Sequence, residues 1–358
     1  MSKVRRPKAD EALLDAVARG DLAAVSARIT AGANVSVGTK QRYPPLFTAA
    51  ASGHIEILRE LIAAGADVNQ LSKIEFETFA SCPLVLAIQR GHFEAAQELA
   101  RAGGKPDLET HPGHNAATVA ARKAIECYWI ASGAAGALAK IAKLPSRERH
   151  RQMRAEWMQF VRDALVRGAR IGDDCLSEAL KLGDEEMALL LIDNGADPDF
   201  ATRWSTVLEQ AIQIGSTKVA LALLKAGAKT DTQERPPLLV AAARDNSVVV
   251  RALLDIGADV DTTGDVMVGE NKTQLFQGTD NDVTINFDGI LSDPLLARKT
   301  TALIVAVRRG NEEIVKLLVD RGADLSIADN GGKTALHWAI DLGWHQIANL
   351  LQDARSKN

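Results

Sequence analysis

The feature that most constrains the fold of this chain is a short segment that recurs along nearly its whole length. A glycine is followed by alanine and then by a polar residue, as in AGADVN at 64–69 and RGADLS at 321–326. Further copies lie at 31–35, 194–199, 226–231 and 256–261. Recurrence of this kind indicates a repeat architecture, in which each copy buries its apolar side chains only against its neighbours.

The residues ahead of each glycine have the spacing of two consecutive helices. Apolar residues recur three and four apart in segments such as HIEILRELIAAGAD, and a shorter alanine-rich segment such as PLFTAAASGH comes before. Glycine suits the end of the second helix because it readily adopts the left-handed conformation that stops a helix. The glycines at this position are Gly32, Gly65, Gly103, Gly136, Gly168, Gly195, Gly227, Gly257 and Gly322.

The last copy carries the most complete motif. Its residues Gly332, Thr334, Ala335, Leu336, His337 and Ala339 follow the pattern G-x-T-P-L-H-x-A, with alanine in place of proline. In these residues the chain resembles the ankyrin-repeat family, whose repeat of about 33 residues is a β-turn and two helices. The resemblance extends over nearly the whole chain. It implies an all-α ankyrin-repeat solenoid of about ten stacked helix-turn-helix repeats with finger loops, two degenerate central repeats and one β-hairpin-like insertion.

Departures from the repeat predict five parts of the chain. They are N-terminal ankyrin repeats at 1–110, degenerate repeats with a basic segment at 111–174, central repeats at 175–263, a hairpin-like insertion at 264–299 and C-terminal repeats at 300–358.

The fourth and fifth copies are the degenerate ones. Tyr128 and Trp129 stand where aliphatic residues are usual, and the basic segment PSRERHRQMR at 145–154 replaces the apolar first helix of the fifth copy. The residues from Trp157 to Gly168 still fit a second helix, so a separate helix is expected there. Two interpretations remain open: an exposed basic element that contacts a partner, and an irregular joint or hinge between two sub-arrays.

The insertion at 264–299 has no helical spacing of apolar residues. It alternates polar and apolar residues around 278–281, which predicts a β-hairpin. Because finger loops of ankyrin repeats lie on the partner-binding side, a long finger is a candidate contact arm, and a solvated hairpin without a role is the alternative. Its acidic residues at 280–288 do not fit the EF-hand pattern, since the required glycine and glutamate are missing.

A row of charge is predicted at the ends of the first helices, six residues after the signature leucine. In the family this position lies near the concave groove. Basic residues at five of nine positions suggest an acidic partner surface, and ordinary solubility is the alternative. The row consists of Arg19, Ser52, Arg90, Lys123, Leu182, Ile214, Arg244, Arg309 and Leu342.

Candidate partner-binding residues are arginines and aromatic residues on the fingers, the row and the insertion, because such side chains commonly anchor interfaces. For Phe76 and Phe79 we favour packing of their own loop. The candidates are Arg42, Tyr43, Arg90, Arg203, Trp204, Arg244, Phe276, Phe287, Arg309 and Trp338.

Composition and motifs exclude several classes of function. The net charge of −4 and the pI of about 6.0 do not indicate a dedicated nucleic-acid-binding protein. The three cysteines lack metal spacing, and no catalytic sequence motif is present, so no cofactor, metal site or catalytic residue is expected. No signal peptide or stretch of about 18 apolar residues is found, which predicts a cytoplasmic protein.

These observations predict a non-catalytic scaffold, adaptor or inhibitor that binds another protein through its groove, its fingers and the 264–299 insertion. We expect the partner to have an acidic surface, and the chain alone to be a monomer without membrane association. The alternative is a nucleic-acid-associated regulator that uses the basic segment at 147–154 and the groove. An enzyme is a third, less favoured hypothesis.

Overall fold

Two units make up the chain, and each is a stack of antiparallel helix pairs. The first unit is Met1–Glu178 and the second is Ala179–Asn358. The computed structural model describes residues 7–75, 78–132, 146–203, 205–232, 235–267 and 296–357.

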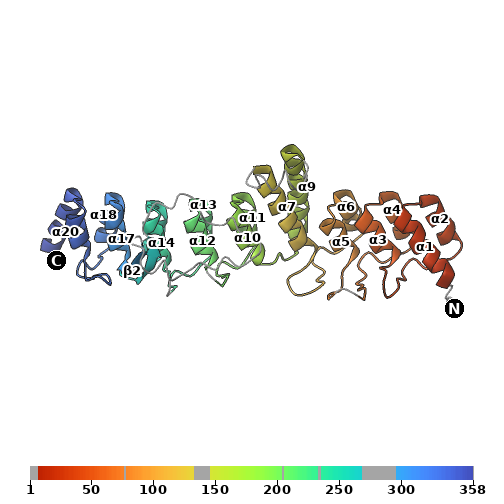
Figure 1. The fold of residues 1–358 in the computed structure, drawn as a ribbon, viewed down its shortest axis with the longest axis horizontal. Helices are drawn as coiled ribbons and strands as arrows, with labels where there is room; N and C mark the ends of the chain where they lie inside the picture. The colour runs from red at the N-terminus through yellow and green to blue at the C-terminus, as the bar shows by residue number, and fades with distance from the viewer. Residues whose placement is uncertain are drawn as a thin grey trace. The chain divides into compact units, whose positions relative to one another are not determined.

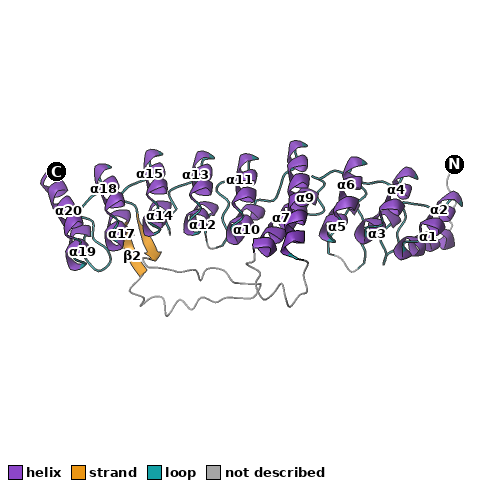
Figure 2. Cartoon of the chain, turned by 90° about the horizontal axis from the view of Figure 1, so that it is seen from above, coloured by secondary structure: helices purple, strands orange, loops and turns teal. Residues whose placement is uncertain are grey.

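In the first unit the helices lie in two layers (Figures 1 and 2). The first helix of each pair packs on the first helix of the next, and the second helices pack on one another in the same way. The short helices are α1 (Pro7–Arg19), α2 (Leu22–Thr30), α3 (Pro45–Ser52), α4 (Ile55–Ala63), α5 (Pro83–Gln89) and α6 (Phe93–Arg101). A pair of longer helices follows, α7 (Ala116–Ser132) and α9 (Arg147–Val166). Helix α10 (Asp174–Leu182) contains the point where the two units meet in the sequence.

The second unit repeats the two-layer arrangement with short helices throughout (Figure 2). Its core is continuous along the stack, because a first helix such as α14 has neighbours on both sides and buries all seven of its residues. Its helices are α11 (Glu185–Asp193), α12 (Val207–Gln213), α13 (Thr217–Lys225), α14 (Pro237–Ala243), α15 (Ser247–Asp255), α17 (Ala302–Arg309), α18 (Glu312–Asp320), α19 (Ala335–Asp341) and α20 (His345–Lys357).

Local sequence explains where the short helices begin and end. Helix α17 ends at Gly310, which has a left-handed φ of 71°. The next residue, Asn311, begins α18 by accepting a hydrogen bond from the Ile314 backbone N–H on its side chain. In α19 the signature residues Thr334 and His337 form a reciprocal capping box. The helix-pair fold predicted from the sequence is therefore confirmed.

The long pair in the first unit differs from the prediction for the fourth and fifth copies. Helix α9 runs without a break through the basic segment and Trp157, where two helices were expected. No glycine lies between Ser146 and Gly168, so nothing favours a left-handed turn. In α7 the buried Ala124 occupies the position at which the short pairs other than α14–α15 have a turn glycine, and the helix continues to Ser132. Residues 133–145 lie outside the described part of the chain.

The base of the predicted hairpin is present as a two-stranded antiparallel sheet. Strand β1 (Thr263–Met267) pairs with β2 (Leu296–Thr301), with Thr263 opposite Thr301 and Met267 opposite Leu296. Gly264 allows β1 to lie against the start of α14, because a Cβ there would be 2.6 Å from Pro236 Cδ. The predicted turn at 278–281 lies outside the described residues.

The loops after the second helices are tethered to one another by a recurring hydrogen bond. A side-chain oxygen in one loop accepts from a backbone N–H in the next, as from Lys229 to Asp199 and from Asp324 to Asp261, both at 2.8 Å. Asn69 accepts from Lys105 in the same way in the first unit. The bond between Asp261 and Asp324 joins the copies on either side of the insertion. These two copies are therefore direct neighbours in the stack.

Candidate functional site

Four residues of the predicted row lie at the ends of first helices that pack consecutively in the second unit, and we call these four the helix-end row. Each member ends or caps a first helix, and α12, α14, α17 and α19 pack consecutively. The helix-end row consists of Ile214, Arg244, Arg309 and Leu342, and the predicted residue Leu182 lies on α10, outside these four helices. Ile214 and Leu342 are each 44% exposed, so apolar side chains stand at both ends of the row with two cations between them.

The centre of the helix-end row is a cluster of two arginines and one aspartate. Arg309 donates from Nε to Asp245 Oδ2 at 3.0 Å and makes a second contact with the same oxygen through Nη2. Asn311 Nδ2 donates to Asp245 Oδ1 at 3.2 Å. The Arg309 side chain is only 21% exposed, so this ion pair is partly shielded from water. Both Asp245 oxygens are therefore engaged.

Arg244 is the cation of this cluster that has no such partner. It is half-buried, and burial lowers the pKa of its guanidinium, with a further lowering by the charge of Arg309. Within the described part of the chain Arg244 forms no ion pair with an acidic side chain. A partly desolvated charge without a counter-charge is energetically costly, so a bound anion would be stabilised here.

Trp338, another predicted site residue, is held firmly by its surroundings. Its indole Nε1 donates to Asp329 Oδ2 at 2.7 Å. The Arg308 guanidinium lies 4.7 Å from the ring centroid and the Lys333 ammonium 4.6 Å from it. Lys333 also pairs with Asp341 at 2.7 Å. The ring is therefore half-buried and fixed by cation–π contacts and one hydrogen bond.

The candidates in the first unit are less closely grouped. Arg42 pairs with Asp15 at 2.7 Å, and the Tyr43 ring stacks on Phe47 with the centroids 5.0 Å apart. Arg90 is exposed at the end of α5. Among the other predicted residues, Arg203 is exposed on the loop between α11 and α12. Trp204, Phe276 and Phe287 lie outside the described residues, as does Phe76.

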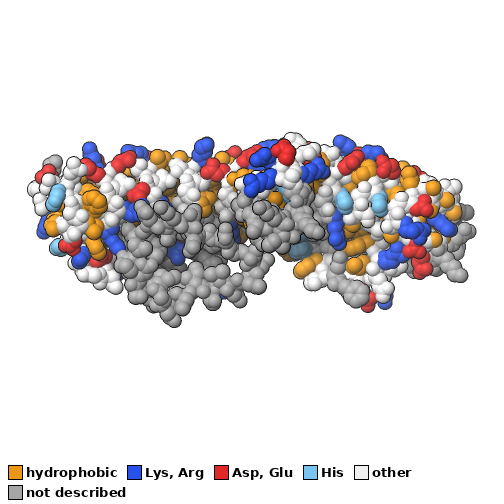
Figure 3. All heavy atoms as spheres, turned by 45° about the horizontal axis from the view of Figure 1, so that its top comes forward, with side chains coloured by type: hydrophobic (Ala, Val, Ile, Leu, Met, Phe, Trp, Pro, Cys, Tyr) orange, Lys and Arg blue, Asp and Glu red, His pale blue; other side chains and the backbone are white. Residues whose placement is uncertain are grey.

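The basic segment at 147–154 forms the first turns of α9. Arg151 pairs with Glu148 at 3.1 Å, Arg149 donates to Gln152, and Arg154 lies over the Tyr128 ring. Its cations are thus partly engaged within the chain. Figure 3 shows acidic and basic side chains interspersed over the second helices of the second unit, without a continuous basic surface on that face. Neither observation favours binding along the phosphate backbone of a nucleic acid.

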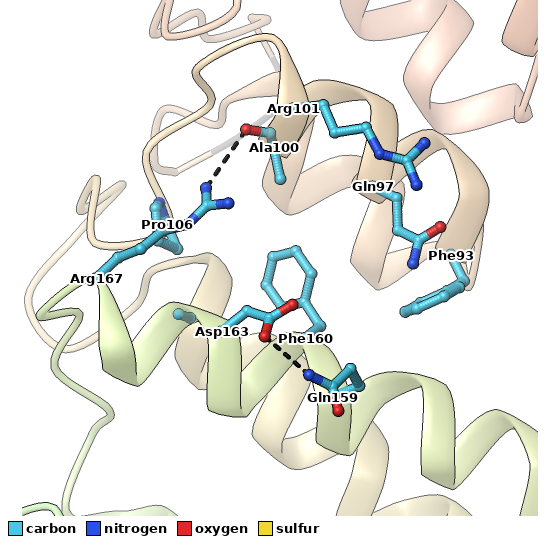
Figure 4. Close-up of a pocket in the computed structure, with 10 residues that line it drawn as sticks. Phe93, Gln97, Ala100, Arg101, Pro106, Gln159, Phe160, Asp163 and Arg167 are labelled. Atoms are coloured by element: carbon cyan, nitrogen blue, oxygen red, sulfur yellow. Dashed lines mark hydrogen bonds between the residues drawn. The ribbon is translucent and has the colours of Figure 1, made fainter.

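A cleft of about 190 Å3 lies between α6 and α9 in the first unit (Figure 4). Phe93 and Phe160 form its apolar side, and both contact the buried Trp157 edge to face. At its rim Gln159 donates to Asp163 at 2.8 Å, and Arg167 donates to the Ala100 carbonyl at 3.4 Å. The cleft arises beside the long helix α9, which sequence reasoning divided in two. It was missed for that reason.

The described residues include buried cysteines whose thiols have raised pKa values. Burial raises the pKa of the Cys127 thiol to about 11 and that of Cys175 to about 12, which keeps both thiols protonated at neutral pH. In the described part of the chain no group of three or more His, Cys, Asp or Glu residues is placed to hold a metal ion. No helix in those residues is long and apolar enough to cross a membrane.

Two histidines near α7 form a stacked group. The ring of His111 lies between those of Phe79 and His114, with centroids 4.4 and 4.2 Å away. Thr110 Oγ1 is 2.8 Å from His114 Nδ1. Burial lowers the pKa of His114, and the nearby His111 and Arg122 lower it further. Phe79 thus packs within its own part of the chain, as the sequence suggested, although its side chain is 53% exposed.

Sequence reasoning missed the partners that organise the helix-end row. It found Arg244 and Arg309 by counting from the signature leucine but did not find Asp245. A signal was available, since Asp245 stands where the other short pairs have glycine and has a positive φ of 54°. Asp329, which holds Trp338, had no comparable signal because loop aspartates are frequent in this chain.

Known proteins match this chain over the helix pairs. A family model of three ankyrin-repeat copies matches residues 176–264 and 272–358, and a model of one ankyrin repeat matches 42–73. The "NAD-capped RNA hydrolase NUDT12" of Homo sapiens is 44% identical over 73 residues, which is 19% of this chain and 16% of that protein. The "Ankyrin repeat and KH domain-containing protein mask-1" of Caenorhabditis elegans is 23% identical over 319 residues, 84% of this chain and 11% of that protein.

A third relative is the "Ankyrin repeat and SOCS box protein 2" of Bos taurus. It is 34% identical over 113 residues, 30% of this chain and 17% of that protein. The chain thus spans less than a fifth of the length of each of these relatives. The family models together cover more than half of the 358 residues and coincide with the stacked helix pairs, and the chain therefore belongs to the ankyrin-repeat family.

Proposed function

We propose that this chain is a non-catalytic scaffold, adaptor or inhibitor that holds a partner protein with an acidic surface. In general terms an ankyrin-repeat array is a protein-interaction scaffold, and this chain is one. The proposal adds that binding uses the helix-end row, the finger loops and the 264–299 insertion. It also adds that the chain is monomeric when alone and acts in the cytoplasm without a cofactor.

One observation carries the proposal. The helix-end row presents two partly exposed apolar side chains, Ile214 and Leu342, together with the half-buried guanidinium of Arg244, which forms no ion pair within the described residues. All of them lie at the ends of short helices that are locked in the core of the stack. Side chains on rigid elements lose little conformational entropy on binding, which favours recognition of a protein surface.

The absence of a reactive arrangement in the described residues supports a binding role over a catalytic one. The thiols are buried with raised pKa values, and the carboxylate of Asp163 at the α6–α9 cleft accepts a hydrogen bond from Gln159. A nucleophile with a neighbouring base, which most covalent mechanisms require, is not found in the part of the chain that the structure describes. Any catalytic effect would then belong to the bound partner.

Affinity purification from the native cell tests the proposal. The intact chain is compared with a variant in which 268–295 is replaced by a short Gly-Ser turn, which keeps the paired strands β1 and β2. If the insertion is a contact arm, a protein retained by the intact chain is lost from the variant. Retention by both chains would restrict the site to the row and fingers. Capture of nucleic acid or a metabolite without any protein would refute the proposed function.

A further inference from the structure

Asp245 gives the second unit a feature that the other short pairs lack. The position between the two helices of a pair has a left-handed φ, and a Cβ there costs about 1 kcal/mol or more. Elsewhere it is glycine: Gly20, Gly53, Gly91, Gly183, Gly215, Gly310 and Gly343. Aspartate at this position is strained, yet its carboxylate binds Arg309 and Asn311. The hydrogen bonds of this carboxylate offset the backbone strain, and they hold Arg309 beside Arg244.

The cluster then holds two positive charges against one negative charge. Asp245 pairs with Arg309, so the three side chains together carry a net charge of +1, and the like charge of Arg309 lowers the pKa of Arg244. Because Arg244 is half-buried, water compensates this charge only in part. A carboxylate placed at Arg244 would supply the missing counter-charge through charge-assisted hydrogen bonds.

The apolar residues of the row determine how side chains must be spaced along a bound segment. Neighbouring packed helices lie roughly 8–10 Å apart, and an extended chain advances about 3.3 Å per residue. One step along the row therefore corresponds to about three residues of an extended segment. Ile214 is one step from Arg244 on one side, and Leu342 is two steps from it on the other.

We propose that the helix-end row binds an extended acidic segment of the partner protein, with one carboxylate on Arg244 beside Arg309. An apolar side chain about three residues from that carboxylate contacts Ile214, and another about six residues away in the opposite direction contacts Leu342. This inference rests on the proposed function and specifies the chemistry of the partner. Charge complementarity selects the acidic segment, and the two apolar contacts set its register.

A library of random twelve-residue peptides, selected on the full chain, tests the inference. The enriched peptides are expected to share an acidic residue with apolar residues at these spacings. Their affinities are then measured by fluorescence anisotropy against three variants. Arg244→Gln is expected to weaken binding about tenfold or more, since it removes hydrogen bonds from a charged group. Arg251→Gln, which removes an exposed charge on α15 in the other layer, is the matched control and leaves the affinity unchanged.

The third variant, Asp245→Asn, is expected to change the affinity for acidic peptides in the opposite direction. Asparagine tolerates the left-handed conformation but removes the negative charge, so acidic peptides are expected to bind more tightly. A merely structural role for Asp245 would weaken binding or leave it unchanged, and either result overturns the inference. Peptides that bind Arg244→Gln as well as the original chain overturn it too, while leaving the protein-binding function intact. If the library gives no binder the inference is wrong, and capture from the native cell decides the proposed function separately.

Discussion

The long pair α7–α9 and the short pairs of the second unit both bury apolar side chains between two helices, but they differ in where the first helix ends. A short pair such as α12–α13 turns at Gly215, which has a φ of 79°. In the long pair, Ala124 occupies the equivalent position and the helix runs on. Longer helices bury more side chains against each other but leave a neighbour uncovered, as the cleft beside α6 shows. The residue at the turn position is therefore one of the differences between the regular short pairs and the long pair.

The largest loss of stability is expected from Trp157→Ala, which removes a buried side chain from the long pair. Trp157 is fully buried on α9 and contacts Phe93 and Phe160. The cavity is expected to cost about 3–5 kcal/mol. Hydrogen exchange should show lost protection of α7 and α9 but unchanged protection of α12 and α13. Val166→Ala on the same helix is the control, because Val166 is 89% exposed. Equal loss of protection in both units would contradict a separate long pair.

Ala124→Gly would test whether the turn residue alone decides helix length. Glycine inside a helix costs about 1 kcal/mol, and loss of the buried methyl group adds a similar amount. We therefore expect about 2 kcal/mol of destabilisation in urea unfolding, with α7 still continuous. Ala155→Gly on the exposed side of α9 should cost only about half as much. Selective loss of hydrogen-exchange protection from 125–132 would instead mean that glycine is sufficient to make a turn.

Gly215→Ala is the reverse exchange in the second unit. A Cβ at this position meets no atom within 4 Å, so the cost comes from the left-handed backbone alone. It is expected to be about 1–2 kcal/mol, measured as a lower urea midpoint. Gly310→Ala is the comparison, since its Cβ would also lie 2.8 Å from the Trp344 ring. Gly310→Ala is therefore expected to lower the urea midpoint more than Gly215→Ala, and a smaller loss would contradict the added contact with Trp344.

The smallest effect is expected in the pH dependence of the stability of the first unit. The pKa of His114 is lowered in the folded first unit by burial, by His111 and by Arg122. The unfolded chain, with the ordinary value of 6.5, therefore binds the proton more readily. The free energy of unfolding is expected to fall as the pH drops through this value. In His114→Asn the urea midpoint should depend less on pH, and an unchanged dependence would assign the effect to other groups.

The sequence predicted the fold wherever glycine marked the helix ends. The period, the capping residues of α19 and the paired base of the insertion follow from residue type and spacing alone. The division of α9 was wrong because the repeat period was extended over 147–166 although no turn residue was present. Helix propensity, which is a local property, was the better guide there.

The candidate site was predictable in position but not in its pairing. Counting along each copy located Arg244 and Arg309 at matching helix ends. Whether those cations are free depends on side chains from a neighbouring pair, such as Asp245 against Arg309, and on how deeply each is buried. Such relations are set by three-dimensional packing, and a single sequence does not contain them in readable form.

The loop hydrogen bond between Asp324 and Asp261 has a consequence for how this protein can vary. It joins two residues that are 63 positions apart in the sequence, and strands β1 and β2 pack on α14 and α17. The stack therefore does not depend on what joins the two strands. Because each doubling of loop length costs only about 0.6 kcal/mol, we expect peptides of other lengths to be tolerated at 268–295. If the insertion contacts the partner as proposed, binding specificity can change at this position without a change in the stacked helices.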